Sequence, residues 1–328
     1  MEAPCVRVPR EAGEEARQAL AAAGVLEQDL EIDLEDGHLH IPVTDPGDVP
    51  EGYEVVRREV EPREGQTTPT DHLAFDPTYE RLGDVAIVDE DDPERAREVA
   101  AAITASDLPV KTVLRKASKV KGEQRTRDWE VLAGDGTETV HREYGFEFAL
   151  DPTEVYFSPR LATERHRVVE TVAAGERAVD MFAGVGPFAV PFAARGAEVV
   201  ATDINGAAVE YLRENARRNG VADRITAIHG DVRAVADDYR GWADRIVMNL
   251  PHSADAFLDT AVAIARDGCL LHYYDIQPDG APFEAGEAAI AAAASDGGYV
   301  ASIEGRRRVR SYAPHEVNVR LDARLEAR

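Results

Sequence analysis

Four polar residues stand where strand-like hydrophobic stretches end in the second half of the chain: Asp180, Asp203, Asp231 and Asn249. The carboxyl ends of parallel strands meet at one edge of an α/β sheet, and ligands bind at that edge. Each of these side chains alone could serve as a helix cap. Their recurrence at four successive strand ends instead predicts one shared site, in which carboxylates accept hydrogen bonds and an amide both donates and accepts.

A glycine turn follows the first of these strands. Gly184 and Gly186 allow the backbone to approach a ligand, because glycine has no Cβ. Asp203 follows Gly184 by 19 residues, a spacing at which a carboxylate accepts hydrogen bonds from ribose hydroxyls. The pattern Asp-x-Phe-x-Gly-x-Gly with an acidic end to the next strand resembles the S-adenosylmethionine site of class I methyltransferases. The resemblance implies that Asp203 holds the ribose and Asp231 the adenine amino group. The predicted cofactor site includes Asp180, Phe182, Gly184, Gly186, Asp203, Asn205, Asp231 and Asn249.

The turn Asn249-Leu250-Pro251-His252 follows the fourth strand. Methyltransferases that act on planar amino nitrogens commonly carry an Asn/Asp-Pro-Pro-aromatic turn at this point. Here Leu250 replaces the first proline and His252 replaces the aromatic residue. These departures disfavour adenine N6 or a glutamine amide as the methyl acceptor.

The chain is strongly acidic, with 37 Lys and Arg against 62 Asp and Glu and a net charge of −25 over 328 residues. Such a balance argues against a polyanionic partner. The argument weakens if the charge is an adaptation to molar salt, in which the Debye length falls to about 3 Å. Because acidic, lysine-poor chains resemble proteins of salt-accumulating halophiles, we expect a halophilic archaeal protein. Local clusters of charge are then a better guide to the binding partner than the net charge.

The lysines are concentrated in one short region. All four, Lys111, Lys116, Lys119 and Lys121, fall within eleven residues, and residues 111–127 contain seven Lys or Arg but one acidic residue. An ordinary solvated loop is the simpler explanation. The reversal of the surrounding composition nevertheless favours a patch that contacts nucleic-acid phosphates.

Strand and helix patterns alternate from residue 176 onward, which predicts a doubly wound parallel sheet. The predicted fold class is α/β, with a Rossmann-like class I methyltransferase domain at the C-terminus preceded by two smaller α+β domains. The expected strands are 178–182, 198–203, 224–229, 244–249 and 269–275, closed by 299–304 and 317–321 with the basic run 306–310 between them. The expected domains are residues 1–48, a linker at 49–70, residues 71–170 with the basic loop, and residues 171–328.

Two cysteines without metal-like spacing give no reason to expect a disulfide or zinc framework. No apolar run approaches the roughly 18 residues of a membrane span, and the first residues show no signal-peptide pattern. We therefore expect a cytoplasmic protein.

From the second domain onward the chain resembles the archaeal and eukaryotic type of tRNA guanosine-37 N1-methyltransferase. The most specific pairing is Tyr-Phe-x-Pro-Arg-Leu-x-x-Glu followed by Asp-x-Phe-x-Gly-x-Gly. The first 48 residues agree with that family only in size and position. The residues that carry the resemblance are Arg125 with 132–134, 156–165, 180–187, and 249–251 with Ala254 and 257–259.

The resemblance implies a mechanism and a partner. Guanine N1 must lose its proton to attack a methyl group, so a carboxylate would serve as general base and a guanidinium would stabilise the charge that develops on O6. Glu164 and Arg125 match these roles, and Asn249 would hold the guanine edge. Tyr156 and Pro251 would shape the cofactor pocket. The implied partner is tRNA with guanosine at position 37, and the elbow of the tRNA would contact residues 1–48. The enzyme would act as a monomer and would use no metal ion. The implied phosphate contacts are Lys116, Lys119, Lys121, Arg160 and Arg165.

Three other functions stay open. A wyosine-pathway enzyme would transfer an aminocarboxypropyl group or methylate a tricyclic base at the same tRNA position. A non-catalytic tRNA-binding protein would not need the complete set of strand-end residues. A small-molecule methyltransferase would leave the basic region unexplained.

Overall fold

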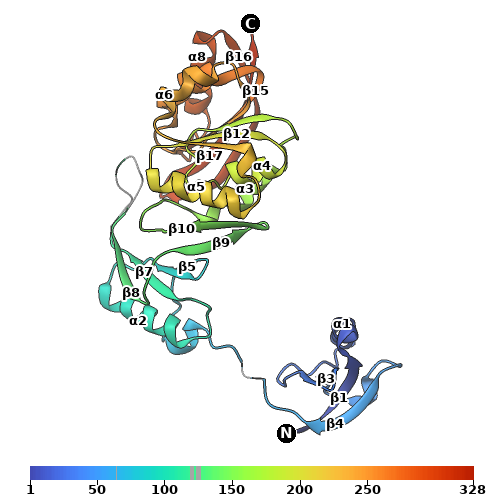
Figure 1. The fold of residues 1–328 in the computed structure, drawn as a ribbon. Coiled ribbons are helices and arrows are strands. Elements are labelled where there is room, and N and C mark those ends of the chain that lie inside the picture. Colours follow the sequence, from blue (N-terminus) through green and yellow to red (C-terminus); the bar gives the residue numbers. More distant parts are fainter. Residues whose placement is uncertain (64, 119–121, 123–126) are drawn as a thin grey trace. The chain divides into compact units, whose positions relative to one another are not determined.

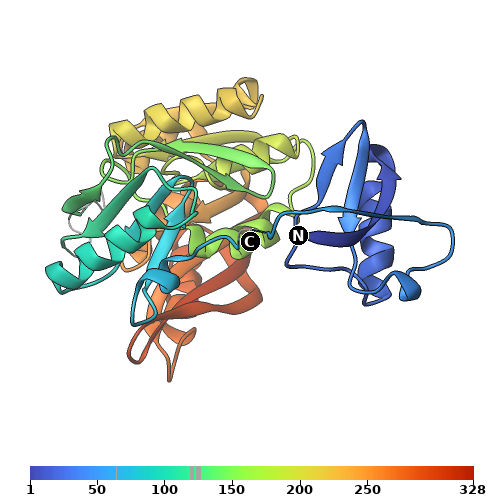
Figure 2. The same cartoon turned by 90° about the horizontal axis from the view of Figure 1, so that it is seen from below.

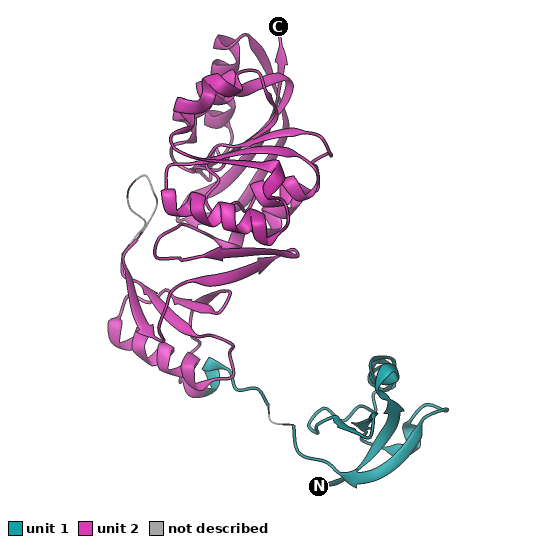
Figure 3. Ribbon diagram, viewed as in Figure 1, with its two compact units in different colours: residues 1–71 teal, residues 72–328 magenta. Residues whose placement is uncertain are grey.

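The computed structural model describes residues 1–328 except residues 64, 119–121 and 123–126. These residues form two compact units, residues 1–71 and residues 72–328, which are coloured separately in Figure 3. None of the described helices is long and apolar enough to cross a membrane.

The first unit is a four-stranded antiparallel sheet with one helix, in the strand order β2-β3-β1-β4 (Figure 1). Leu20 on the helix is buried against Val6 and Ile41 of the sheet, which gives the unit its own apolar core. Its elements are β1 (Glu2–Pro9), α1 (Gly13–Ala22), β2 (Asp33–Glu35), β3 (His38–Pro42) and β4 (Glu54–Glu59).

Strand β4 corrects the expectation of a linker over residues 49–70. Its sequence, Glu-Val-Val-Arg-Arg-Glu, carries four charges in six residues and therefore does not read as a strand. The strand forms because it pairs with β1 along residues 2–7, and Val55 and Val56 are half-buried there. Exposed charges suit an edge strand, since they discourage further pairing.

The second unit begins with a small sheet in the order β5-β6-β7-β8, in which α2 connects the parallel pair β6 and β7. Asp92 caps α2 by accepting a hydrogen bond from the amide of Glu94, and Pro93 occupies the first turn, where its missing N–H costs nothing. A separate hairpin, β9–β10, follows. The elements are β5 (Tyr79–Leu82), β6 (Val85–Val88), α2 (Pro93–Ala105), β7 (Thr112–Lys116), β8 (Trp129–Ala133), β9 (Thr139–Glu143) and β10 (Phe146–Leu150).

A seven-stranded sheet forms the rest of the unit, in the order β13-β12-β11-β14-β15-β17-β16. The first five strands of that order are parallel, whereas β17 runs antiparallel to both of its neighbours. This topology confirms the predicted α/β class. The strands are β11 (Arg177–Asp180), β12 (Glu198–Asp203), β13 (Ile225–His229), β14 (Ala243–Met248), β15 (Ala265–Pro278), β16 (Tyr299–Ala313) and β17 (Glu316–Ala327).

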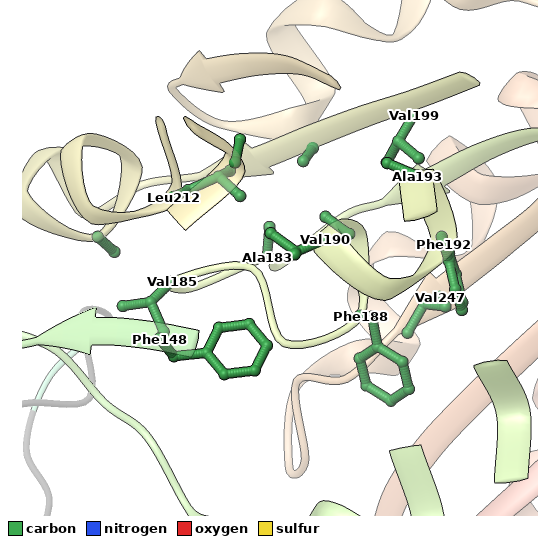
Figure 4. Packing of buried hydrophobic residues seen from close by; sticks show 14 of the residues in the cluster. Phe148, Ala183, Val185, Phe188, Val190, Phe192, Ala193, Val199, Leu212 and Val247 are labelled. Atoms are coloured by element: carbon green, nitrogen blue, oxygen red, sulfur yellow. The ribbon is translucent and has the colours of Figure 1, made fainter. Parts of the chain in front are cut away.

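Helices cover both faces of this sheet, as the two views of the ribbon show (Figures 1 and 2). Successive strand residues point to opposite faces, so Ala178 of β11 packs with Phe188 and Leu212 while Val179 packs with the other core. Figure 4 shows the first core, in which Phe148 of the hairpin joins side chains of the sheet and its helices. The helices are α3 (Ala162–Val169), α4 (Ala189–Ala194) and α5 (Gly206–Arg218) with the first core, and α6 (Val232–Val235), α7 (Leu258–Ile264) and α8 (Glu284–Asp296) with the second.

Two asparagines join the hairpin to α5. Asn215 accepts a hydrogen bond from the backbone N–H of Ala149 (2.7 Å) and donates to its carbonyl (3.1 Å). Asn219, at the end of the helix, makes the same pair of bonds with Glu147 (3.0 and 2.8 Å). The free edge of β10 is therefore satisfied by side chains of a helix.

The last two strands are longer than their sequence predicts. Arg306–Arg310, expected between two strands, lies within β16, and β17 continues to Ala327, so the expected strand ends at 304 and 321 are wrong. Arginines tolerate this position because β16 is an edge strand and acidic groups lie beside it. Arg306 binds Glu287, and Arg308 donates a hydrogen bond to the carbonyl of Asp279.

Candidate active site

A cavity of about 630 Å³, which we call the main cavity, opens at the carboxyl ends of the parallel strands. It is lined by residues that follow β11, β12, β13 and β14, where the strand order reverses between β11 and β14. Such a switch point is the usual ligand site of an open α/β sheet. The predicted site residues that line it are Tyr156, Arg165, Phe182, Gly184, Asp203, Asn205, Asp231, Asn249 and Pro251.

Asp203 is held by the glycine turn. Its carboxylate accepts hydrogen bonds from the backbone N–H groups of Gly184 (2.7 Å) and Asn205 (2.8 Å). Burial raises the pKa of this carboxyl, and the two backbone donors oppose the rise. Each oxygen keeps a lone pair for a further donor, so the carboxylate is positioned to accept bonds from a diol.

The two glycines of the turn serve different purposes. Gly184 has φ +53°, and a Cβ there would have only the carbonyl oxygen of Tyr156 near it, at 3.8 Å. Gly186 has φ +90°, does not line the cavity, and a Cβ there would lie 2.4 Å from Cδ1 of Leu212. Close packing against α5 therefore explains why residue 186 is a glycine. The expectation that Gly186 lets the backbone approach a ligand is wrong.

An aromatic pair and an ion pair line the main cavity beside the start of α6. Phe182 packs edge-to-face on Phe257, with ring centroids 5.0 Å apart, and the guanidinium of Arg233 lies 4.7 Å from the Phe257 ring. Asp231 caps α6 and binds Arg233, which lowers the pKa of its carboxyl. This part of the cavity offers flat apolar surfaces next to an acidic acceptor, which fits a purine ring with an amino group.

Asn205 is mainly a cap. Its side-chain oxygen accepts a hydrogen bond from the amide of Ala207 at the start of α5, and its Nδ2 donates to the carbonyl of Glu154. Both ends of the amide are thus occupied, although the residue lines the cavity. The segment before Tyr156 is tied to β12 in this way.

Asp180 lies beneath the glycine turn and does not line the cavity. Neither carboxylate oxygen has a hydrogen-bond partner among the described residues. Burial raises the pKa of Asp180 to about 7; the backbone amides of Phe182 and Ala189 oppose that rise without meeting the geometry of a full hydrogen bond.

Asn249 follows β14, and its side-chain amide makes no hydrogen bond to another described residue. The turn that carries it is supported from below. Asp275, buried in β15, accepts a hydrogen bond from the amide of His252, whose φ is +77°. The imidazole of His252 packs edge-to-face on Tyr312. The turn is therefore held firmly while the amide of Asn249 stays available for a ligand.

Glu164 is not among the residues that line the main cavity. Its carboxylate accepts hydrogen bonds from Arg320 (2.6 Å) and Tyr274 (3.3 Å) and pairs with Arg307 (2.9 Å) and Arg167 (3.3 Å). Burial raises the pKa of Glu164, and the neighbouring arginines oppose the rise. The structure thus does not bring the expected base together with Asn249.

The expected phosphate contacts differ in their surroundings. Arg165 is buried and donates to both carboxylate oxygens of Glu143 and to the carbonyl of Ser158, so it supports the 156–158 segment and has no free charge for a phosphate. This corrects the expectation for Arg165. Arg160 is exposed and pairs with Glu80, and Lys116 pairs with Asp89. Lys119, Lys121 and Arg125 lie outside the described residues.

Several cavity residues escaped the sequence analysis because no motif marks them. Arg127, Arg310, Tyr312 and Asn318 come from β16, β17 and the segment before β8. Their distance along the chain from the glycine turn hid them; the basic region 111–127, which contains Arg127, and the basic run 306–310, which contains Arg310, gave the only signals.

The cavity fits S-adenosylmethionine. The open space at Gly184, the oriented carboxylate of Asp203 and the edge-to-face pair of Phe182 and Phe257 suit the parts of a nucleoside. The described residues contain no group of three or more His, Cys, Asp or Glu side chains arranged to hold a metal ion.

Three family models match the chain. They are the TRM5/TYW2 methyltransferase domain over residues 139–300, the tRNA methyltransferase 5 N-terminal domain over residues 5–51, and the TYW2 N-terminal domain over residues 65–137.

Two relatives define the similarity. The tRNA (guanine(37)-N(1))-methyltransferase Trm5b of Pyrococcus abyssi is 40% identical over 98% of both chains. The tRNA(Phe) (4-demethylwyosine(37)-C(7)) aminocarboxypropyltransferase of Pyrococcus horikoshii is 35% identical over 75% of this chain and 88% of its own.

Solved structures agree. The crystal structure of Pyrococcus abyssi Trm5b superposes with a TM-score of 0.72 at 38% identity, over 99% of each chain. The complex of aTrm5 with tRNALeu gives 0.71 at 31% identity, over 98% of this chain and 99% of the other. Methanocaldococcus jannaschii TYW2 in complex with AdoMet gives 0.63 at 27% identity, over 76% of this chain and all of the other. The chain therefore belongs to the archaeal and eukaryotic type of tRNA (guanine-37 N1)-methyltransferase family and carries its Rossmann-like class I methyltransferase domain.

Proposed function

We propose that this protein transfers a methyl group from S-adenosyl-L-methionine to N1 of guanosine 37 in tRNA. The observation that carries the proposal is the match to Trm5b along nearly the whole of both chains, including the N-terminal domain. The geometry of the main cavity supports it, because an oriented carboxylate and a free amide lie along one pocket.

The cofactor supplies an electrophilic methyl group on a sulfonium centre. Asp203 binds its ribose hydroxyls, Asp231 binds its adenine amino group, and Phe182 packs against the adenine. The backbone at Gly184 faces the methionine part, with Tyr156 and Pro251 closing the pocket. The hydrogen bonds that orient Asp203 and the aromatic pair of Phe182 support the first and third of these assignments. The others rest on the family resemblance and on the place of these residues in the wall of the main cavity.

Asn249 orients the guanine. An amide can donate to an acceptor on the guanine edge and accept from the exocyclic amino group at once, which leaves the N1 proton to the base. The Asn249 amide has no competing partner among the described residues. The turn beneath it is held by Asp275. A preorganised contact of this kind keeps N1 aligned with the methyl group.

Glu164 takes up the N1 proton in this proposal. Its raised pKa, caused by burial, suits a general base. Leu161, directly before α3, and Arg165 of α3 line the main cavity, and Glu164 is the residue before Arg165 on that helix. To reach the base, the Glu164 side chain must exchange its bonds to Arg320 and Tyr274 for one to guanine N1.

Arg125 stabilises the charge on O6. This assignment rests on the family resemblance, because Arg125 lies outside the described residues. Gly122 and Arg127, the described residues on either side of it in the sequence, both line the main cavity. Lys116 and Arg160 are proposed to contact tRNA phosphates, and residues 1–48 to contact the tRNA elbow.

Tritiated methyl transfer tests the proposal directly. In high KCl, a tRNA transcript with guanosine at position 37 should accept label at N1, and a matched transcript with adenosine there should not. Equal labelling of both transcripts would move the target to another nucleotide and refute the proposal.

Aminocarboxypropyl transfer at the same position is the second candidate, supported by the relative from Pyrococcus horikoshii. That similarity leaves about a quarter of this chain unmatched, whereas the similarity to Trm5b does not. Cofactor labelled in the methyl group and cofactor labelled in the methionine carboxyl group separate the two reactions, because only one label reaches the tRNA in each.

A further inference from the structure

A second, smaller cavity of about 100 Å³ adjoins the main cavity; we call it the side pocket. Both cavities are lined by Tyr156, Phe157, Ser158, Arg127 and Arg310, so they form one continuous depression. The volume of the side pocket equals that of about three water molecules. It can hold a group of that size but leaves no room for a whole nucleotide.

Two buried donors in the side pocket have no acceptor. Nε1 of Trp129 and Nε of Arg310 are both inaccessible to solvent, and neither has a hydrogen-bond partner among the described residues. An unpaired buried donor is costly, and such groups are normally satisfied by a ligand or by ordered water. Neither nitrogen can accept a hydrogen bond, so the missing partner must be an acceptor.

The charge of the side pocket narrows the ligand further. Lys116, Arg127, Arg160 and Arg310 line it against the single carboxylate of Glu80. Asp89 already pairs with Lys116, and Glu80 with Arg160. No ion pair joins Arg310 to a described carboxylate, which leaves its charge available. In a chain of net charge −25, this local excess of cations favours a small, oxygen-rich anion.

We propose that the side pocket binds a backbone phosphate of the tRNA, directly next to the nucleotide whose base enters the main cavity. The inference rests on the proposed function, because the main cavity must hold the target base for its phosphate to reach the side pocket. Trp129 and Arg310 each donate a hydrogen bond to the phosphate oxygens. Arg310, which lines both cavities, marks the point where the backbone passes from one to the other.

The test combines protein variants with neutral phosphates. Arg310→Gln removes the donor and the charge. Arg308→Gln is the matched control, because Arg308 lies on the same strand but bonds to Asp279 and lines neither cavity. Trp129→Phe removes the indole donor, and Trp242→Phe is its control, since Trp242 packs on Tyr239 elsewhere in the unit. Each variant is tested in high KCl for binding of transcripts with a methylphosphonate on either side of nucleotide 37.

One methylphosphonate should weaken tRNA binding by wild-type protein and by Arg308→Gln about 10- to 100-fold, the value of a hydrogen bond to a charged group. The same substitution should leave binding by Arg310→Gln almost unchanged, because the contact is already lost. Trp129→Phe should lose about 3- to 10-fold in affinity for the unmodified transcript, and Trp242→Phe should not. Equal losses in wild type and Arg310→Gln, or no loss in wild type, would overturn the proposal.

Calorimetric binding of S-adenosylmethionine reports whether each variant is folded. If Arg310→Gln loses cofactor binding, the loss of affinity caused by the methylphosphonate is compared between wild-type protein and Trp129→Phe. It should be smaller in Trp129→Phe, because one hydrogen bond to the phosphate is already missing. Failure of the proposed function gives a different result: wild-type protein would bind the transcript and transfer no methyl group to guanosine 37.

Discussion

Glu164→Gln tests both the buried arginine cluster and the proposed base. Glu164 is 5% exposed and Arg320 is 3% exposed, and their nearest atoms are 2.6 Å apart. The substitution keeps the shape of the side chain but removes its charge. It leaves the guanidinium of Arg320 buried with one carboxylate fewer.

The expected loss of stability follows from these contacts. Removing one partner of a buried ion pair costs about 3–5 kcal/mol. Asp322 still accepts a hydrogen bond from Arg320 at 2.6 Å, so we expect the lower end, about 3 kcal/mol. A domain of this size loses about 2–4 °C of unfolding temperature per kcal/mol. The midpoint should therefore fall by roughly 6–12 °C.

Thermal unfolding of the full chain in high KCl measures this effect. Arg307→Gln is the control, since Arg307 pairs with the same carboxylate but is 47% exposed at its side chain. An exposed pair contributes at most about 1 kcal/mol, so the control should shift the midpoint much less. A midpoint for Glu164→Gln that matches the control would refute the reasoning, because the pair with Arg320 would then carry no stability.

The same variant then reports on catalysis. A general base contributes about 10²- to 10⁴-fold to the rate, so single-turnover methyl transfer should fall by at least about 100-fold at a temperature where the variant is folded. A rate within a few fold of wild type would exclude Glu164 as the base.

Further predictions concern Asp180 and Gly186 at the glycine turn, the side-chain amide of Asn249, and the dependence of stability on salt concentration. Because burial raises the pKa of Asp180 from 3.8 to about 7, the folded state holds that proton more tightly than the unfolded chain, and stability should fall as the pH rises from about 4 to 7. Asp180→Asn should remove this dependence, so thermal unfolding at about pH 8 and about pH 5 should favour the variant more at the higher pH. Gly186→Ala, with φ +90° and a contact of 2.4 Å to Leu212, should lose about 2–4 kcal/mol in denaturant unfolding; a wild-type midpoint would contradict the packing explanation. Asn249→Ala should lower the rate of methyl transfer about 10- to 100-fold while leaving calorimetric cofactor binding intact, and parallel losses in both would count against a contact with guanine. The unfolding temperature should rise with KCl into the molar range, since a net charge of −25 repels itself in dilute buffer; full stability and activity at low salt would contradict the halophilic interpretation.

The sequence predicted the parallel strands and the glycine turn well, because these features are local. A short apolar run that ends in a polar residue, repeated from strand to strand, suffices to place Asp203 and Asn249 beside one cavity. The same reasoning missed β4 and the outer half of β16, where charged side chains replace the apolar pattern. Pairing with a neighbouring strand stabilises those segments, and no local pattern records that pairing.

The surroundings of individual side chains were harder to predict than their positions. Glu164 is 156 residues from Arg320 in the chain, and no spacing rule connects them. Arg165 reads as a surface cation, but tertiary packing places it against Glu143. Sequence motifs thus located the site, whereas the partners that decide each group's charge and freedom come from distant strands.

The asparagine contacts between α5 and the hairpin also determine alignment. Four helical residues rise about 6 Å, and two strand residues span about 6.6–6.8 Å, so Asn215 and Asn219 match Ala149 and Glu147 in only one way. A shift of the strand by two residues would leave one amide without its backbone partner, and Asn215 is fully buried. An unpaired amide there costs about 1–3 kcal/mol. Two side chains therefore set the register in which the hairpin meets the helix beside the glycine turn.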